Sequence, residues 1–179
     1  MNPEASPQSP LSAAESYRRE MFRLAGEADP SEAMSGMPMA LRELVVDAGE
    51  HLRARPAEGE WSALELVGHM LDAEVVVGSR LRQILAEDRP QLAGFDQDAW
   101  VRAQRHNEAD PEALLEALTA LRPLTVSLYR GLSEGNRDRV GIHAERGPES
   151  LRTVYRMLAG HDIFHLNQVR ETVANARGG

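Results

Sequence analysis

The amino-acid sequence predicts an all-α fold: a four-helix bundle with an additional N-terminal helix and a short helix in a crossover connector. Three observations favour this fold class. Apolar residues recur at the 3.6-residue period of amphipathic helices, capping residues and prolines stand where these segments begin, and no segment supports a strand. The chain of 179 residues suits a single domain, which we expect to span residues 12–179.

The predicted elements are separated by clusters of Gly, Pro and Asp. Three prolines among small polar residues predict a disordered tail before the first helix. The predicted boundaries are 1–11 for the tail, 12–27, 38–54, 62–86, 111–132 and 149–175 for the helices, and Asp98–Gln104 for the short helix in the connector 87–110. Long amphipathic helices bury their apolar stripes by packing together, which gives the bundle.

Helix starts are marked by side chains that can accept hydrogen bonds from free backbone N–H groups. Ser12-x-x-Glu15 and Ser62-x-x-Glu65 fit the capping-box pattern, and Asp29-Pro30 and Asp110-Pro111 each place a cap before proline at the first helical position. Trp61 and Leu66 stand where a hydrophobic staple would pack. The helix start at residue 62 is therefore specified twice.

Composition and charge exclude several classes of function. The chain has 28 acidic and 20 basic residues, a formal net charge of -8, so no overall positive field attracts nucleic acid. It has no cysteine, hence no disulfide or thiolate ligand, and its basic residues are all arginine, hence no Schiff-base lysine. Its apolar runs fall short of the roughly 20 residues of a membrane span, and no secretory signal pattern is present. We expect a cytoplasmic protein that binds neither nucleic acid nor membrane.

The predicted last helix carries polar residues in its apolar stripe. Asp162 and His165 fall inside the stripe, and His161 lies on its flank. Burying such groups without partners costs on the order of 1–3 kcal/mol each, so partners are expected. The two histidines are one helical turn apart, where both imidazoles can reach one cation. The pattern alone also allows one histidine to be a hydrogen-bonded core residue and the other a surface residue.

The predicted helix 62–86 offers two further candidates. His69 lies at the border of its apolar stripe, as a metal ligand or a solvated side chain. Glu74 falls near the middle, as a buried acid beside the metal or as a sign that the stripe is narrower. A di-iron bundle is excluded because no Glu stands three residues before any His. His51 and His106, in polar surroundings, receive no role.

Three segments stand out together: Glu60–His69 (EWSALELVGH), Gly141–His143 (GIH) and Gly160–Gln168 (GHDIFHLNQ). They resemble the DinB-like superfamily of metal enzymes, which includes the YfiT-type proteins and is unrelated to the translesion polymerase of the same name. In that family a histidine of the second bundle helix and a His-x-x-x-His pair of the last one bind a divalent metal ion. The resemblance covers residues 38–175 and implies that His69, His161 and His165 are the metal ligands.

The resemblance also implies an activity, because family members include hydrolases, isomerases and transferases that use low-molecular-weight thiols. It predicts an enzyme in which metal-activated water or a thiol acts on a small-molecule substrate. Three imidazoles leave a coordination position open, as catalytic sites do. Zinc or nickel is the preferred ion, with manganese and iron as alternatives. A low-molecular-weight thiol is a further candidate cofactor, and a homodimer is expected.

Other residues near the ligands receive alternative roles. Asp162 or Glu74 would handle protons, although Asp162 is interpreted more simply as fixing an imidazole through a hydrogen bond. His143, in a Gly- and Arg-rich loop, is a wall of the metal pocket or a solvated loop residue. Arg139 and Arg146 of this loop would grip an acidic substrate or solvate the turn. The competing function is a non-catalytic, stress-related dimerisation module in which the metal only ties two helices together.

Overall fold

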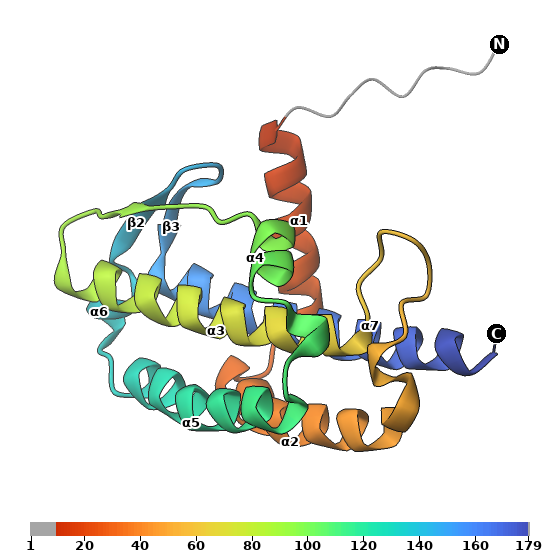
Figure 1. The fold of residues 1–179 in the computed structure, drawn as a ribbon. Helices are drawn as coiled ribbons and strands as arrows, with labels where there is room; N and C mark the ends of the chain where they lie inside the picture. The colour runs from red at the N-terminus through yellow and green to blue at the C-terminus, as the bar shows by residue number, and fades with distance from the viewer. Residues whose placement is uncertain (1–9, 179) are drawn as a thin grey trace, which may run out of the picture.

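The computed structural model describes residues 10–178 of the chain (Figure 1). Helices form most of this part, which confirms the predicted fold class. The α-helices are α1 (Pro10–Ala25), α2 (Pro30–Ala48), α3 (Ala63–Ala86), α4 (Gln97–Ala103), α5 (Pro111–Arg130), α6 (Glu134–Arg137) and α7 (Leu151–Gly178), and 3₁₀ helices cover Gly49–Arg53 and His106–Glu108. None of the described helices is long and apolar enough to cross a membrane.

Four long helices, α2, α3, α5 and α7, make up the bundle. Both α5 and α7 pack against α2 and against α3, so the four helices close a ring around a shared core. Figure 1 shows them running lengthwise beside one another. Each contributes a fully buried residue to one apolar cluster: Leu41, Leu64, Leu118 and Val169. The core therefore holds α3 and α7, the two helices with the candidate ligands, in one fixed arrangement.

Helix α1 is the predicted additional N-terminal helix, and it packs across α7 (Figure 1). The contact depends on Gly160, because a Cβ there would overlap the carbonyl oxygen of Met21 and lie 2.7 Å from its carbonyl carbon. Only glycine allows the two backbones to approach so closely. Since α1 begins at Pro10, Ser12 lies inside the helix and the capping box predicted there is wrong. Residues 1–9 of the predicted tail lie outside the described residues.

Helix α2 begins at Pro30, as the cap signal Asp29-Pro30 predicts, whereas the predicted span, which starts at residue 38, is wrong. The Asp29 carboxylate caps it by accepting a hydrogen bond of 2.9 Å from the backbone N–H of Ser31. Pro38 lies inside the helix, where its missing N–H removes one intrahelical hydrogen bond. Buried residues on both sides, Met34 and Leu41 among them, hold α2 against the bundle and outweigh this loss.

Helix α3 begins as the capping box predicts. The Ser62 hydroxyl accepts a hydrogen bond of 3.1 Å from the backbone N–H of Glu65, and the Glu65 carboxylate accepts one of 2.8 Å from the N–H of Ser62. Trp61 packs against the apolar cluster that contains Leu66. These contacts fix where the helix starts, and therefore which face of the helix His69 occupies.

The prediction that the chain forms no strands is wrong. A small sheet consists of β1 (Gln91–Leu92), β2 (Val140–His143) and β3 (Gly147–Ser150), with β1 parallel to β2 and β2 antiparallel to β3. Such short strands cannot show a recognisable alternation of apolar and polar residues. Because β3 includes Ser150, α7 begins at Leu151 rather than at residue 149.

The sheet is tied to the bundle by Arg139, which immediately precedes β2. Its guanidinium donates hydrogen bonds to the carbonyl oxygens of Ile84, at 2.9 Å, and Glu87, at 2.5 Å. These carbonyls belong to the C-terminal end of α3, where a cation interacts favourably with the helix dipole. Arg139 therefore binds the end of α3 and neither solvates the turn nor projects toward a substrate. The sheet that it ties to the bundle positions His143, the last residue of β2.

Candidate metal centre

Helices α3 and α7 bring three histidine side chains together. His69 comes from α3, and His161 and His165 come from successive turns of α7. One ring nitrogen of each lies within 4.8 Å of those of the other two. The Nε2 atoms of His69 and His161 are 3.0 Å apart. The three ligand candidates of the sequence therefore form one cluster.

The three imidazoles are buried and neutral at pH 7. Their exposed fractions are 1% for His69 and 8% each for His161 and His165. Burial lowers the pKa of His69 to about 3 and that of His165 to about 4, and it lowers the pKa of His161 well below its usual value. A neutral imidazole keeps a nitrogen lone pair, which is what a metal ion binds.

The ring orientations fit a divalent cation. Nδ1 of His165 donates a hydrogen bond of 2.8 Å to the side-chain oxygen of Gln168, which leaves its Nε2 as the ligand atom. Zinc–nitrogen bonds of about 2.0–2.1 Å in a tetrahedral site separate two ligand nitrogens by about 3.3 Å, close to the distance between His69 and His161. Among the described residues no Asp or Glu joins this cluster. The site therefore offers three protein ligands and leaves an open position.

A buried arginine pairs with both carboxylates that the sequence singles out. Two guanidinium nitrogens of Arg122, on α5, lie 2.8 and 3.0 Å from the oxygens of Asp162, and its Nε lies 3.2 Å from Glu74. The three side chains are almost completely buried, and burial raises the pKa of Asp162 to about 6 although Arg122 opposes the shift. Among the described residues, neither Asp162 nor Glu74 forms a hydrogen bond with an imidazole. Asp162 therefore binds Arg122, and the prediction that it fixes an imidazole through a hydrogen bond is wrong.

Arg122 is not among the residues predicted from the sequence, although its place in α5 carries a signal. Leu115, Leu118, Arg122 and Val126 follow one another at helical spacing along α5, and each is buried. A charged residue inside such a stripe requires a buried partner. This requirement, together with the unexplained acids on α3 and α7, points to the cluster that the structure contains.

His106 is a second residue whose place differs from the sequence interpretation. It is buried, and its Nε2 lies 2.9 Å from a carboxylate oxygen of Asp72, on α3 one turn after His69. The amide of Gln104 donates to the other oxygen at 2.9 Å. The imidazole packs against Gly68 so closely that a Cβ there would overlap the ring. The His106–Asp72 pair thus joins the connector to α3 beside the metal centre.

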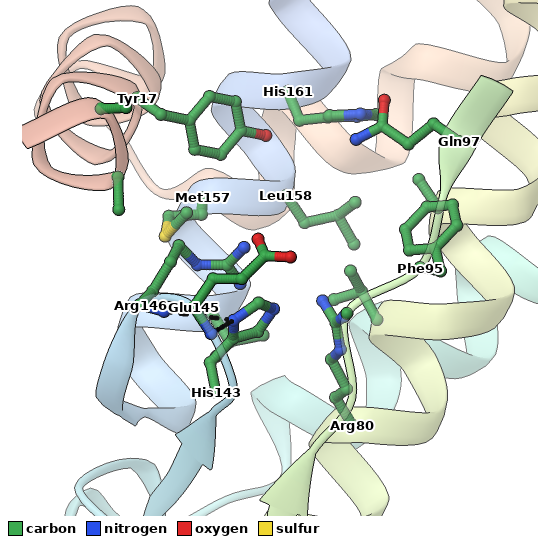
Figure 2. Close-up of a pocket in the computed structure, with 16 residues that line it drawn as sticks. Tyr17, Arg80, Phe95, Gln97, His143, Glu145, Arg146, Met157, Leu158 and His161 are labelled. Atoms are coloured by element: carbon green, nitrogen blue, oxygen red, sulfur yellow. Dashed lines mark hydrogen bonds between the residues drawn. The ribbon is translucent and has the colours of Figure 1, made fainter. Parts of the chain in front are cut away.

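A cavity of about 440 Å³ adjoins the metal centre, with His161 in its wall (Figure 2). Its other walls come from α1, α3, α7, the segment before α4 and the β2–β3 hairpin. His143 lines it and is 2% exposed, so the interpretation of His143 as a solvated loop residue is wrong. Nδ1 of His143 accepts hydrogen bonds from the backbone N–H groups of Glu145 and Arg146 at 3.2 and 3.4 Å. The hairpin thus fixes the ring at the cavity wall.

The helical bundle and its three clustered histidines, on α3 and α7, can be compared with known protein families. The model of the DinB superfamily matches residues 33–169, which include all three histidines. The chain belongs to this superfamily.

Several relatives of this chain are named as metal-dependent hydrolases. A protein of Oceanobacillus iheyensis named "Putative metal-dependent hydrolase" is 28% identical over 129 residues, covering 72% of this chain and 74% of the relative. YfiT of Bacillus subtilis, which bears the same name, is 23% identical over 143 residues, with 77% and 80% covered. The solved structure of YfiT aligns with a TM-score of 0.74 at 19% identity, over 99% of this chain and 94% of YfiT. YfiT is described as "a probable metal-dependent hydrolase with an unusual four-helix bundle topology". The structural likeness confirms the four-helix bundle fold of this chain.

Proposed function

We propose that this protein is a divalent-metal-dependent hydrolase that acts on a small molecule. The observation that carries the proposal is the set of three buried imidazoles without a fourth protein ligand among the described residues, next to a cavity of about 440 Å³. Structural zinc sites are closed by four protein ligands, whereas catalytic ones keep a position for water or substrate. The names of the relatives support the same class.

The chemistry follows from the donor set. A divalent ion held by three neutral imidazoles supplies Lewis acidity, lowering the pKa of bound water towards about 7 and polarising a carbonyl group. The residues of this chain hold the ion and shape its surroundings. Gln168 orients His165 through the Nδ1 hydrogen bond. Arg122, Glu74 and Asp162 form a fixed charge cluster in which the two acids outnumber the one cation, and this favours a cation on the histidines.

Both acids are positioning residues in this proposal, because Arg122 occupies them. Asp162 follows His161 directly on α7, so its bond to Arg122 anchors the helical turn that presents two of the ligands. Glu74 anchors α3 to the same guanidinium. With both carboxylates held by Arg122, neither is free to exchange protons with a substrate bound at the histidines.

A thiol transferase would use the same open position for a different nucleophile. The chain has no cysteine, so a low-molecular-weight thiol would have to enter the cavity as a second substrate. An assay with and without added thiol separates the two reactions. Ester hydrolysis without thiol supports the hydrolase, and turnover only in the presence of thiol overturns it in favour of the transferase.

The test begins with the metal content of tag-free protein. Wild type is expected to carry close to one equivalent of a divalent metal by elemental analysis, and His69→Ala/His165→Ala close to none. His51→Ala, which removes a histidine outside the cluster, serves as the matched control and should retain the metal. Equal metal in all three proteins would refute the site. Hydrolysis of p-nitrophenyl esters should then be abolished by a chelator and restored by the metal.

The competing non-catalytic role predicts a different outcome. A metal that only ties α3 to α7 would be required for folding and would give no turnover of esters or thiols. Circular dichroism of the chelated protein measures the first property. Unfolding on chelation, together with inactivity of the loaded protein, would overturn the hydrolase and leave the dimerisation module as the function to examine.

A further inference from the structure

One end of the cavity is polar and has no part in the proposed hydrolytic chemistry. Arg80 and His143 lie at this end, and Figure 2 shows them across the cavity from His161, with Leu158 and Phe95 in between. Both polar side chains are buried, with exposed fractions of 7% and 2%. Buried polar groups normally have hydrogen-bond partners within the protein. Here part of that capacity is unused, which points to a ligand.

His143 presents an unpaired donor. Its Nδ1 accepts two backbone hydrogen bonds, so the ring hydrogen of the neutral imidazole must be on Nε2. Burial lowers the pKa of His143 to about 4, which keeps the ring neutral at pH 7. Nε2 is buried and has no hydrogen-bond partner among the described residues. An unpaired buried donor is unfavourable unless something binds to it.

Arg80 is the second polar side chain at this end with unused hydrogen-bonding capacity. Its Nη2 donates a hydrogen bond of 2.5 Å to the carbonyl oxygen of Ala93, and within the described chain no carboxylate pairs with its guanidinium. Arg146 differs, because Nε and Nη2 bind the two oxygens of Glu149 at 2.8 and 3.0 Å. Arg80 is therefore the cation of this cavity that has donors available for an anion.

We propose that Arg80 and the Nε2–H of His143 bind a carboxylate group of the substrate, whose reacting group lies at the three histidines. The guanidinium fork and one further N–H match the two oxygens of a carboxylate. Leu158 and Phe95 lie between the two ends, so the part of the substrate that joins carboxylate and reacting group is apolar. This assignment of substrate class rests on the proposed hydrolase function.

A single negative charge fits better than a phosphate group. Glu145 also lines the cavity, and its carboxylate lies over Gly94, where a Cβ would come within 2.9 Å of it. It forms no ion pair with another described residue, so its negative charge lies in the same space as the positive charge of Arg80 and repels an anion bound there. A phosphate monoester carries close to two charges at pH 7, and Glu145 would repel it more strongly than a carboxylate.

The test is isothermal titration calorimetry of the metal-loaded protein with 3-phenylpropanoate, and with 3-phenylpropanamide as its uncharged counterpart. The acid is expected to bind more tightly than the amide. Arg80→Gln should weaken binding of the acid by about 10- to 100-fold, as expected for loss of a hydrogen bond to a charged group. Arg170→Gln removes the same charge from the exposed face of α7 and should leave binding unchanged.

Glu145→Gln is expected to increase affinity for the acid, a change that misfolding of the variant would not produce. Removal of the opposing charge should tighten binding of 3-phenylpropanoate while binding of the amide stays constant. Equal affinity of wild type and Arg80→Gln for the acid would overturn the proposal. Tighter binding of phenyl phosphate than of the acid would also overturn it, because the site would then be one for phosphate.

The His69→Ala/His165→Ala variant separates this subsite from the metal centre. Neither histidine lines the cavity, so this variant should still bind 3-phenylpropanoate. Loss of binding in this variant, with full binding in Arg80→Gln, would place the carboxylate on the metal and refute the subsite. If wild type proves to contain no metal but Arg80-dependent binding persists, the hydrolase proposal fails and the carboxylate site stands.

Discussion

The contact between α1 and α7 makes Gly160→Ala a sharp test of the packing. The added methyl group would overlap the carbonyl oxygen of Met21, which belongs to the backbone of another helix and cannot rotate away. Relief requires α1 to move by about 1 Å, and overpacking of this kind costs about 1–3 kcal/mol. Alanine is favoured over glycine in a helix by about 1 kcal/mol. Because a helix rather than a side chain must move, we expect a net loss of about 1–2 kcal/mol.

Urea unfolding followed by circular dichroism measures this loss, which corresponds to a decrease in Tm of about 2–4 °C per kcal/mol for a chain of this size. Gly36→Ala is the matched control. Gly36 lies in α2 on an exposed surface, and a Cβ there meets nothing within 4 Å, so this variant should gain up to about 1 kcal/mol. If Gly160→Ala were as stable as Gly36→Ala, the close approach of α1 to α7 would be refuted.

Two further predictions concern buried charge. Arg122→Leu leaves two buried carboxylates without their cation and should lower the free energy of unfolding by about 3–5 kcal/mol; Arg42→Leu, which breaks an exposed pair, should cost less than about 1 kcal/mol. Equal urea midpoints for the two variants would contradict this. In metal-free protein the depressed pKa values of His69 and His165 mean that the unfolded chain binds more protons below pH 6.5. Stability should therefore fall by about 2 kcal/mol per histidine from pH 7.5 to pH 5, and the His69→Ala/His165→Ala variant should show a weaker dependence. Equal pH dependence of stability in wild type and in this variant would contradict the assignment of the effect to the two histidines.

The sequence predicts those parts of the fold that repeated local signals specify. The start of α3 is one example, because the Ser62–Glu65 capping box and the contacts of Trp61 all lie within a few residues of one another. The helical period likewise reveals α5 and α7, whose apolar stripes extend over many turns. The cap at Asp29-Pro30 marks the true start of α2, whereas the predicted span begins only at residue 38; Pro38 lies inside the helix, where packing against the bundle holds it.

The candidate site also contains residues that local sequence patterns predict and residues that only the packing of the helices brings together. His161 and His165 are predictable as a pair because they are one turn apart on one helix. Their meeting with His69, and the partner of Asp162, depend on how α3, α5 and α7 pack, which local patterns do not encode. The position of His143 depends on a sheet whose strands are too short to recognise. His106 has a polar sequence neighbourhood, and only the tertiary contact with Asp72 buries it.

One wall of the cavity comes from α1, through Ala13, Ala14 and Tyr17. These positions precede residue 33, where the match to the superfamily model begins. The three histidines and this part of the cavity wall are therefore encoded by separate stretches of the chain. Under the proposed function, exchange of this one short helix would alter which small molecules fit the cavity while the three histidines stayed in place.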